Sequence, residues 1–306
     1  MTVHESVLLG EAIAGLAIAK SGIYIDATFG RGGHSQAILE NLGPNGRLMA
    51  IDTDPEAVSV AQSDPRFSDP RFEIVHASFA RLEALVSVRG WLGCVDGILF
   101  DLGVSSPQLD SAGRGFSFLR EGPLDMRMNP KTGVDAMTWI NAATADEIAD
   151  VLFHFGEERL SRKIARAILQ ARETEKIQTT TQLASLIEKI IPRRGNDKHP
   201  ATRTFQAIRI FINQELSAIQ AVLPQALHAL KTGGRLCVIS FHSLEDRLVK
   251  QFIRREKKGE EYPPDFPAPA HQATLKVIGE SAVATKEEVM RNPRARSARL
   301  RILEKL

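Results

Sequence analysis

Strands and helices alternate over the first hundred residues, and this alternation restricts the fold more than any other feature of the chain. Short apolar segments with strand character end at Asp26, Asp52 and Asp101, and turn-forming residues follow each of them. Strand–helix–strand repeats favour a parallel sheet with helices on both faces. Because the carboxyl ends of parallel strands share one edge, where open α/β sheets bind ligands, the sequence predicts an α/β fold with three carboxylates at that edge.

A glycine-rich loop follows the first strand, where residues 26–35 read Asp-Ala-Thr-Phe-Gly-Arg-Gly-Gly-His-Ser. Glycines allow positive φ angles and a close approach of the backbone to a nucleotide-like ligand. The spacing disfavours a nicotinamide oxidoreductase, because the third glycine of the dinucleotide fingerprint would fall at Ser35. An acid before closely spaced glycines resembles instead the first motif of S-adenosylmethionine-dependent methyltransferases. A glycine turn of any α/β protein would look similar.

Polar and aromatic residues at the other strand ends suggest individual roles. Asp52 lies nineteen residues after Gly33, close to the spacing of an acid that binds ribose hydroxyls. Asp54 suits the N-cap of the next helix better, which would leave Asp52 free for a ligand. Phe79 follows the third strand and either stacks on adenine or belongs to the core. Asp101, at the end of the fourth strand, would lie beside the methylsulfonium.

The alternation stops after residue 109, and helical patterns dominate until strand character returns at residues 235–240. We therefore predict one discontinuous methyltransferase domain, residues 1–109 and 206–306, with a helical substrate-recognition domain inserted at residues 110–205. Thr144 and Glu147 form a capping box at the start of one inserted helix. A single long helix is predicted from about Thr202 to Leu223, and the last strand near residues 299–303.

Residues after the fourth strand would receive the methyl acceptor. Amino-directed nucleic-acid methyltransferases place a [S/N/D]-P-P-[Y/F] segment there, and Ser105-Ser106-Pro107-Gln108 is a degraded relative of it. The missing aromatic would have to come from elsewhere. Phe116 and Phe118 are candidates, although the sequence favours a packed hairpin for both.

The distribution of charge points to a polyanion in the second part of the chain. Residues 1–109 have a balance of −6 and residues 110–306 a balance of +8. Solvated helix faces would explain the same residues, so both interpretations stay open. The candidates for phosphate contacts are Arg162, Lys163, Arg166, Arg193, Arg194, Lys198, Arg254, Arg255, Lys257 and Lys258.

Neither a targeting segment nor a membrane span is expected. The N-terminus lacks the basic-then-apolar form of a signal peptide, and no apolar run is long enough to cross a bilayer. We therefore predict a cytoplasmic protein without a membrane partner. Cys94 and Cys237 lie in apolar, strand-like runs and are predicted to be reduced core residues rather than disulfide or metal ligands.

Seven long motifs, in order, cover nearly the whole chain and make its resemblance to a known family specific. The chain is similar to the bacterial ribosomal RNA small subunit methyltransferase H family, also called MraW. The segments that carry the resemblance are residues 26–35, Phe100–Asp110 (Phe-Asp-Leu-Gly-Val-Ser-Ser-Pro-Gln-Leu-Asp), Gly115–Phe118 (Gly-Phe-Ser-Phe), Gly122–Met128 (Gly-Pro-Leu-Asp-Met-Arg-Met), Thr202–Ile210 (Thr-Arg-Thr-Phe-Gln-Ala-Ile-Arg-Ile), Ser240–Asp246 (Ser-Phe-His-Ser-Leu-Glu-Asp) and Asn292–Ala298 (Asn-Pro-Arg-Ala-Arg-Ser-Ala).

The resemblance implies a Rossmann-like class I methyltransferase sheet and N4-methylation of a cytidine in the decoding region of 16S rRNA. S-adenosylmethionine would be the co-substrate and no metal would be required. The partner would be 16S rRNA or the small ribosomal subunit, and a homodimer stays open. Ser105, Ser106 and Pro107, with Asp101, would shape the pocket for the cytosine. The implied cofactor contacts are Gly32, Gly33, His34, Asp52, Phe79, Asp101 and Gln108.

Two other functions share these features. The chain could methylate another RNA or a protein, because the inserted domain rather than the fold selects the substrate. It could also be a non-catalytic ribosome-assembly factor that binds RNA, although intact acids at the strand ends disfavour this.

Overall fold

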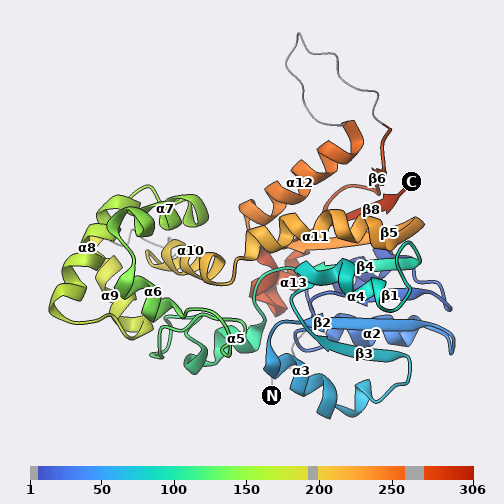
Figure 1. The fold of residues 1–306 in the computed structure, drawn as a ribbon, viewed down its shortest axis with the longest axis horizontal. Helices are drawn as coiled ribbons and strands as arrows, with labels where there is room; N and C mark the ends of the chain where they lie inside the picture. Colours follow the sequence, from blue (N-terminus) through green and yellow to red (C-terminus); the bar gives the residue numbers. More distant parts are fainter. Residues whose placement is uncertain (1–5, 192–198, 259–271) are drawn as a thin grey trace, which may run out of the picture. The chain divides into compact units, whose positions relative to one another are not determined.

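The computed structural model describes residues 6–191, 199–258 and 272–306. The chain forms two compact units. The sheet unit is Met1–Gly103 together with Leu216–Leu306, and the helical unit is Val104–Glu215. Figure 1 labels helices and strands of both units.

The sheet unit is built on one twisted sheet with the strand order β3-β2-β1-β4-β5-β8-β6, and β7 pairs with β8. Strands β1 to β5 run parallel, whereas β8 is antiparallel to β5 and to β6 and β7. This is the parallel α/β sheet that the alternation predicts, and its strand order agrees with the Rossmann-like class I sheet that the family resemblance implies. The strands are β1 Ile23–Asp26, β2 Arg47–Asp52, β3 Phe72–His76, β4 Val95–Asp101, β5 Leu230–Ser240, β6 Leu275–Val277, β7 Ala282–Val283 and β8 Arg299–Lys305.

Both faces of this sheet are buried, which explains the continuous apolar runs in its strands. Alternate residues of β4 point to opposite faces, with Ile98 and Phe100 in one core and Leu99 in the other. Helices α4, α11 and α12 bury residues in the first core, and α1, α2 and α3 in the second. The helices of the unit are α1 Leu9–Leu16, α2 Gly33–Asn41, α3 Pro55–Ser63, α4 Leu82–Ser87, α11 Glu215–Ala229, α12 Ser243–Lys258 and α13 Lys286–Arg291, with 3₁₀ turns at Pro65–Phe67, Phe79–Arg81 and Pro293–Ser297.

One of the two cysteines lies outside the core, contrary to the prediction. Cys237 is buried in β5, and burial raises the pKa of its thiol to about 12. Cys94 is exposed, because the apolar run around it is a turn that precedes β4 rather than part of the strand. No helix in the described part of the chain combines the length and apolarity needed to cross a membrane.

The helical unit has its own apolar core, formed by residues from α6 to α10 and from the loop before α6 (Figure 1). The predicted capping box is present in α7, where Glu147 accepts the N–H of Thr144 at 2.7 Å and Thr144 accepts that of Glu147 at 3.3 Å. The helices are α5 Ser106–Asp110, α6 Ala136–Ala142, α7 Ala145–Gly156, α8 Ser161–Thr174, α9 Thr180–Ile190 and α10 Thr202–Ile212, with a 3₁₀ turn at Ala112–Arg114.

The helical unit is longer at both ends than the predicted insertion at residues 110–205. Helix α10 belongs to it because Phe205 and Ile208 are buried in its core, among residues of α6 to α9. The predicted long helix from Thr202 is also wrong. It is broken into α10 and α11, because Gln214 adopts a left-handed conformation with a φ of 52°.

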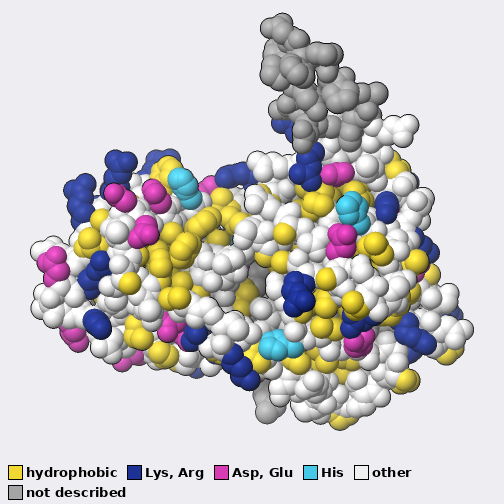
Figure 2. Space-filling view, in the orientation of Figure 1, with side chains coloured by type: hydrophobic (Ala, Val, Ile, Leu, Met, Phe, Trp, Pro, Cys, Tyr) yellow, Lys and Arg dark blue, Asp and Glu magenta, His cyan; other side chains and the backbone are white. Residues whose placement is uncertain are grey.

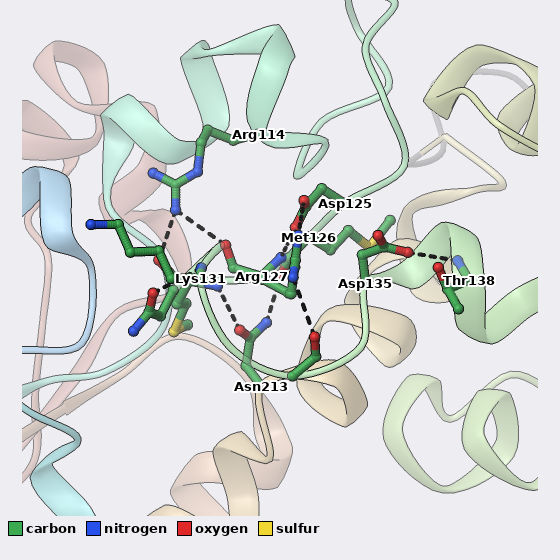
Figure 3. Close-up of polar contacts among 11 residues, drawn as sticks. Arg114, Asp125, Met126, Arg127, Lys131, Asp135, Thr138 and Asn213 are labelled. Carbon is green, nitrogen blue, oxygen red and sulfur yellow. Dashed lines mark hydrogen bonds and ion pairs between the residues drawn. The ribbon is translucent and has the colours of Figure 1, made fainter.

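Asn213 connects the end of α10 to the loop that carries the Gly122–Met128 motif (Figure 3). Its side-chain nitrogen donates to the carbonyl of Met126 at 2.7 Å, and its side-chain oxygen accepts the N–H of Met128 at 2.7 Å. Arg114 donates to the carbonyls of Arg127 and Met128 from the other side of this loop. The motif is therefore held by side chains from two distant segments of the helical unit.

Candidate functional site

The loop between β1 and α2 is closed by Asp26 at the end of β1. The Asp26 side chain is buried, accepts the Ser35 hydroxyl at 2.6 Å and accepts the N–H of Thr28 at 3.2 Å. Burial raises the pKa of this carboxyl, against the opposing effects of His34 and the hydrogen bonds. Asp26 therefore joins the start of the loop to the first turn of α2, and its oxygens are used within the protein.

Two glycines give the loop its shape. Gly30 and Gly32 have φ angles of 55° and 76°, in the left-handed region that favours glycine. A Cβ atom on Gly32 would lie 2.3 Å from the ring of Phe67, and one on Gly33 would lie 2.0 Å from the Ser6 hydroxyl oxygen. Packing against the rings of Phe67 and Phe29 is thus a sufficient reason for glycine at position 32, whereas at position 33 rotation of the Ser6 hydroxyl would relieve the contact.

Asp52 lies at the carboxyl end of β2, beside this loop. One carboxylate oxygen accepts the N–H of Gly30 at 2.7 Å, and the other accepts the N–H of Asp54 at 2.8 Å. Burial raises the pKa of Asp52 to about 6, although both hydrogen bonds act in the opposite direction. Asp54 caps α3 as predicted, by accepting the N–H of Glu56 at 2.9 Å. Asp52 is therefore not needed as the cap, and although both of its oxygens orient the backbone, each accepts only one N–H and keeps a lone pair for a further donor.

Asp101 occupies the equivalent place at the end of β4, on the other side of β1. Its Oδ2 atom lies 3.6 Å from Nδ1 of His34, and its Oδ1 atom is buried with no hydrogen-bond partner in the described residues. Burial raises the pKa of Asp101 to about 6, with His34 opposing and Asp26 and Glu245 reinforcing the shift. Unpaired buried oxygens are rare in folded proteins, so this carboxyl is ready to accept a ligand donor.

His34 is held at the start of α2 with one ring nitrogen directed at the backbone. Its Nε2 atom lies 3.1 Å from the carbonyl oxygen of Val7, which can only accept. The proton of a neutral ring is then on Nε2, and Nδ1, the nitrogen that faces Asp101, has a free lone pair. The Asp101 carboxyl, whose pKa is raised by burial, therefore faces a ring nitrogen that can accept a hydrogen bond when the ring is neutral.

Phe79 begins the short turn after β3 and is half-buried. Its ring packs edge-on against Phe100 of β4 with 5.6 Å between the ring centroids. The two interpretations of Phe79, adenine platform and core residue, are compatible because only part of the ring is covered.

The segment after β4 belongs to the helical unit and starts α5. The side-chain oxygen of Gln108 accepts the N–H of Ser105 at 2.9 Å, Gln108 is buried, and Pro107 lies in the first turn. Phe116 is buried, and Phe118 packs on His199 and Phe205 with centroid distances of 4.4 and 4.8 Å. Both phenylalanines are therefore packing residues of the helical unit, but the predicted hairpin is wrong, because the segment that carries them forms no strands.

Two residues near Asp101 were missed by the sequence reasoning. The hydroxyl oxygen of Thr28 accepts the N–H of Asp101 at 2.7 Å, which fixes the end of β4 against the glycine loop. Glu245 is fully buried, and it accepts the N–H groups of Phe241 and His242 at 2.7 and 3.2 Å. A Glu in the first turn of α12 was a recognisable capping signal, but its nearness to Asp101 depends on the pairing of β4 with β5.

Comparisons with known proteins agree on one family. The model described as the MraW methylase family matches residues 1–306. The chain is 56% identical over 308 residues to a protein from Coxiella burnetii, covering 100% of both chains, and 57% identical over 305 residues to one from Nitrosococcus oceani, covering 99% of this chain and 96% of the relative. A third relative, from Hydrogenovibrio crunogenus, is 54% identical with the same coverage. All three relatives are named ribosomal RNA small subunit methyltransferase H.

Proposed function

Because the chain belongs to the MraW methylase family, we propose that it transfers a methyl group from S-adenosylmethionine to the exocyclic N4 of a cytidine in the decoding region of 16S rRNA. The names of its relatives support an rRNA of the small subunit as the substrate. The observation that carries the proposal is the placement of two partly buried carboxyl groups, Asp52 and Asp101, on either side of the glycine loop after β1.

The residues of the sheet unit are chemically suited to this donor. Asp52 would accept the ribose hydroxyls, and Phe79 would pack on the adenine. Gly32 and Gly33 would pass under the methionine part, with His34 closing the loop beside it. The unpaired Oδ1 of Asp101 would accept a hydrogen bond from the amino group of the donor's methionine part, near its reactive end. Gln108, whose oxygen holds Ser105, would act with Asp101 by shaping the segment that follows β4.

The reaction asks mainly for positioning. When bound, S-adenosylmethionine supplies an electrophilic methyl carbon on a sulfonium, and an amine lone pair displaces the sulfur in line. Holding both partners in a near-attack geometry can contribute about 7–11 kcal/mol without a metal or covalent intermediate. Ser105, Ser106 and Pro107 would form the floor for the cytosine, and polar acceptors there would localise the N4 lone pair. The proton that N4 loses would pass to water or to a backbone carbonyl.

The decisive experiment combines purified protein and methyl-labelled S-adenosylmethionine with either free 16S rRNA or small ribosomal subunits. The RNA is digested to nucleosides, and the label is identified by mass spectrometry. We expect N4-methylcytidine with at least one of the two substrates, and the comparison tells which one is used. Label in another nucleoside would indicate a different target. Donor binding without turnover would indicate a ribosome-assembly factor instead.

Two further expectations follow from an rRNA substrate. The site of action would be the cytoplasm, where ribosomal subunits are assembled, which fractionation of cells that express the tagged protein checks. A homodimer would have to leave the substrate pocket of each copy accessible. Light scattering at the protein concentration of the methylation assay measures the oligomeric state.

A further inference from the structure

A basic groove lies on the helical unit where α7 ends and α8 begins. It has a volume of about 800 Å³, and its lining includes Phe153, His154, Arg159, Arg162 and the neighbouring Lys163 and Arg166. All six side chains are exposed. In Figure 2, Lys and Arg side chains gather along the upper left border, beside exposed hydrophobic side chains and a histidine.

Local structure explains why these side chains point outward. Helix α7 buries Val151 and Leu152, which turns Phe153 and His154 to the other side, and their rings lie 5.2 Å apart. Glu157 ends the helix in a left-handed conformation with a φ of 49°. These contacts present an aromatic ring at the end of α7.

The turn that follows, and the first half of α8, supply the cations. The buried carboxylate of Glu158 accepts the N–H of Leu160 at 2.9 Å and thereby holds the turn that carries Arg159. Helix α8 then buries Ile164 and Ile168, so that Arg162, Lys163 and Arg166 lie on its outer side. The groove is therefore formed by two packed helices and the turn that joins them.

The cations of this groove differ from many others in the protein because they have no acidic partner. Within the described ranges, no carboxylate lies within 4.0 Å of the charged groups of Arg159, Arg162, Lys163 or Arg166, and Asp150 is the sole acid in the lining. Elsewhere, Arg71 pairs with Asp69, and Arg127 pairs with Asp125 at 2.7 Å. Four unpaired cations around one groove create a local positive potential that suits a polyanion.

From this groove we infer that the helical unit binds a single-stranded segment of the substrate RNA here, an inference that rests on the proposed function. Charge alone would suit any polyanion, but Phe153 adds a specific feature. The residue is 56% exposed, although a phenylalanine ring normally avoids water. An exposed ring among cations is what single-strand binding uses, since bases stack on the ring while phosphates contact the Lys and Arg side chains. An acidic protein surface would bind the cations but would offer no bases to stack on the ring.

The test measures binding of a fluorescent single-stranded oligoribonucleotide, free 16S rRNA and small ribosomal subunits by anisotropy or filter retention. Phe153→Leu removes the ring face but keeps an apolar side chain, so we expect RNA binding to weaken roughly 5- to 150-fold. Phe153→Tyr should restore it. Lys163→Ala should lower the slope of log K against log salt by about 0.7, and Arg159→Ala with Arg162→Ala and Arg166→Ala by about 2.

Matched controls separate these effects from general loss of charge or stability. Lys176→Ala removes an exposed lysine just beyond the other end of α8 and should leave the salt slope unchanged. Thermal unfolding and the affinity for S-adenosylmethionine should be those of the unmodified protein in every variant. These two measurements show that each variant is folded.

Three outcomes decide the inference. If the Phe153 and cation variants keep the RNA affinity, the salt slope and the methylation of the unmodified protein, the groove does not bind RNA. The proposed function would then still stand. Weaker binding of assembled subunits with unchanged binding of free RNA would indicate a protein partner and also overturn the inference. Absence of RNA binding and methylation by the unmodified protein would remove the proposed function as well.

Discussion

At the scale of single residues, the candidate site consists of carboxyl groups whose environments differ. Asp26 is buried and bonded within the glycine loop, Asp52 is bonded to two backbone N–H groups, and Asp101 keeps one oxygen unpaired. Each of the three aspartates is the last residue of a strand, so the sequence pattern does not distinguish them. Their hydrogen bonds do. Asp26 is accordingly a structural residue, whereas Asp52 and Asp101 can each accept a hydrogen bond from a bound molecule.

Asp52→Ala should weaken binding of S-adenosylmethionine about 10- to 150-fold, because a hydrogen bond to a charged group contributes about 1.5–3 kcal/mol. Isothermal titration calorimetry measures this change directly. Asp54→Ala is the matched control, since it removes the N-cap of α3 two residues later. That variant should lose about 1 kcal/mol of stability and keep its affinity for the donor. Equal affinities in both variants would contradict the role of Asp52.

Asp101 should make stability depend on pH. Its pKa rises from the ordinary 3.8 to about 6 in the folded protein, so the folded state binds a proton more readily than the unfolded chain. The free energy of unfolding therefore falls as the pH rises between about 4 and 6, and the cost persists above pH 6. Asp101→Asn removes this cost.

We expect Asp101→Asn without ligand to be more stable than the unmodified protein at pH 7.5, by a difference on the order of 1–3 kcal/mol that disappears towards pH 4. Urea unfolding at several pH values measures it. Glu280→Gln, at an exposed position of the same unit, is the control for loss of a carboxylate. A stability difference that stays constant with pH would show that ionisation of Asp101 is not the cause.

At the scale of elements, the glycine loop and the break after α10 show how packing selects residues. The loop needs glycine at position 32 both for its φ of 76° and because the Phe67 ring occupies the place of a Cβ atom. The break after α10 is stabilised by Asn213, which satisfies the backbone of the Met126–Met128 loop (Figure 3). The glycine loop and the Gly122–Met128 motif therefore each have a structural reason for their residues.

Gly32→Ala should destabilise the protein by clearly more than Gly90→Ala. Both glycines have a positive φ, 76° and 68°, but a Cβ on Gly90 would meet no atom within 4 Å. The conformational cost alone is about 1–2 kcal/mol, and the clash with Phe67 adds to it only at position 32. Urea unfolding of the two variants gives the difference, and equal losses would mean that Phe67 can move aside at little cost.

At the scale of the whole molecule, the basic excess of the sequence is not concentrated in the helical unit. Val104–Glu215 has 16 Lys and Arg against 14 Asp and Glu, a balance of +2, whereas residues 216–306 of the sheet unit have 16 against 10, a balance of +6. The local grouping of four cations without an acidic partner among the described residues therefore distinguishes the groove of the helical unit, and the net charge of that unit does not. Arg254, Arg255, Lys257 and Lys258 lie at the end of α12, where Arg255 pairs with Glu256. Arg193, Arg194 and Lys198 lie outside the described residues.

Binding of rRNA should therefore depend on salt far more than binding of the methyl donor. Four phosphate contacts predict a loss of about 50-fold in RNA affinity between 50 and 200 mM salt, from the counterions released per contact. The affinity for S-adenosylmethionine, measured by calorimetry in the same buffers, is the internal control and should change little. A flat salt response of RNA binding would argue against phosphate contacts.

The sequence by itself determined the sheet and the residues at its edge. Strand periodicity, the glycine loop and the positions of Asp52 and Asp101 are local signals, and each is confirmed in the structure as an element or a strand end. Local signals also located the capping box of Thr144 and the N-cap at Asp54. Chemistry at these positions follows from residue type, so the function could be proposed before any fold was known.

Only the tertiary structure decided which neighbours those residues have. The exposure of Cys94 depends on where β4 begins, and the break at Gln214 and the membership of α10 in the helical unit depend on contacts between distant segments. The same is true of the bonds that occupy Asp52 and the burial that raises the pKa of Asp101. Periodicity reports which side of an element is apolar, but it does not report what covers that side.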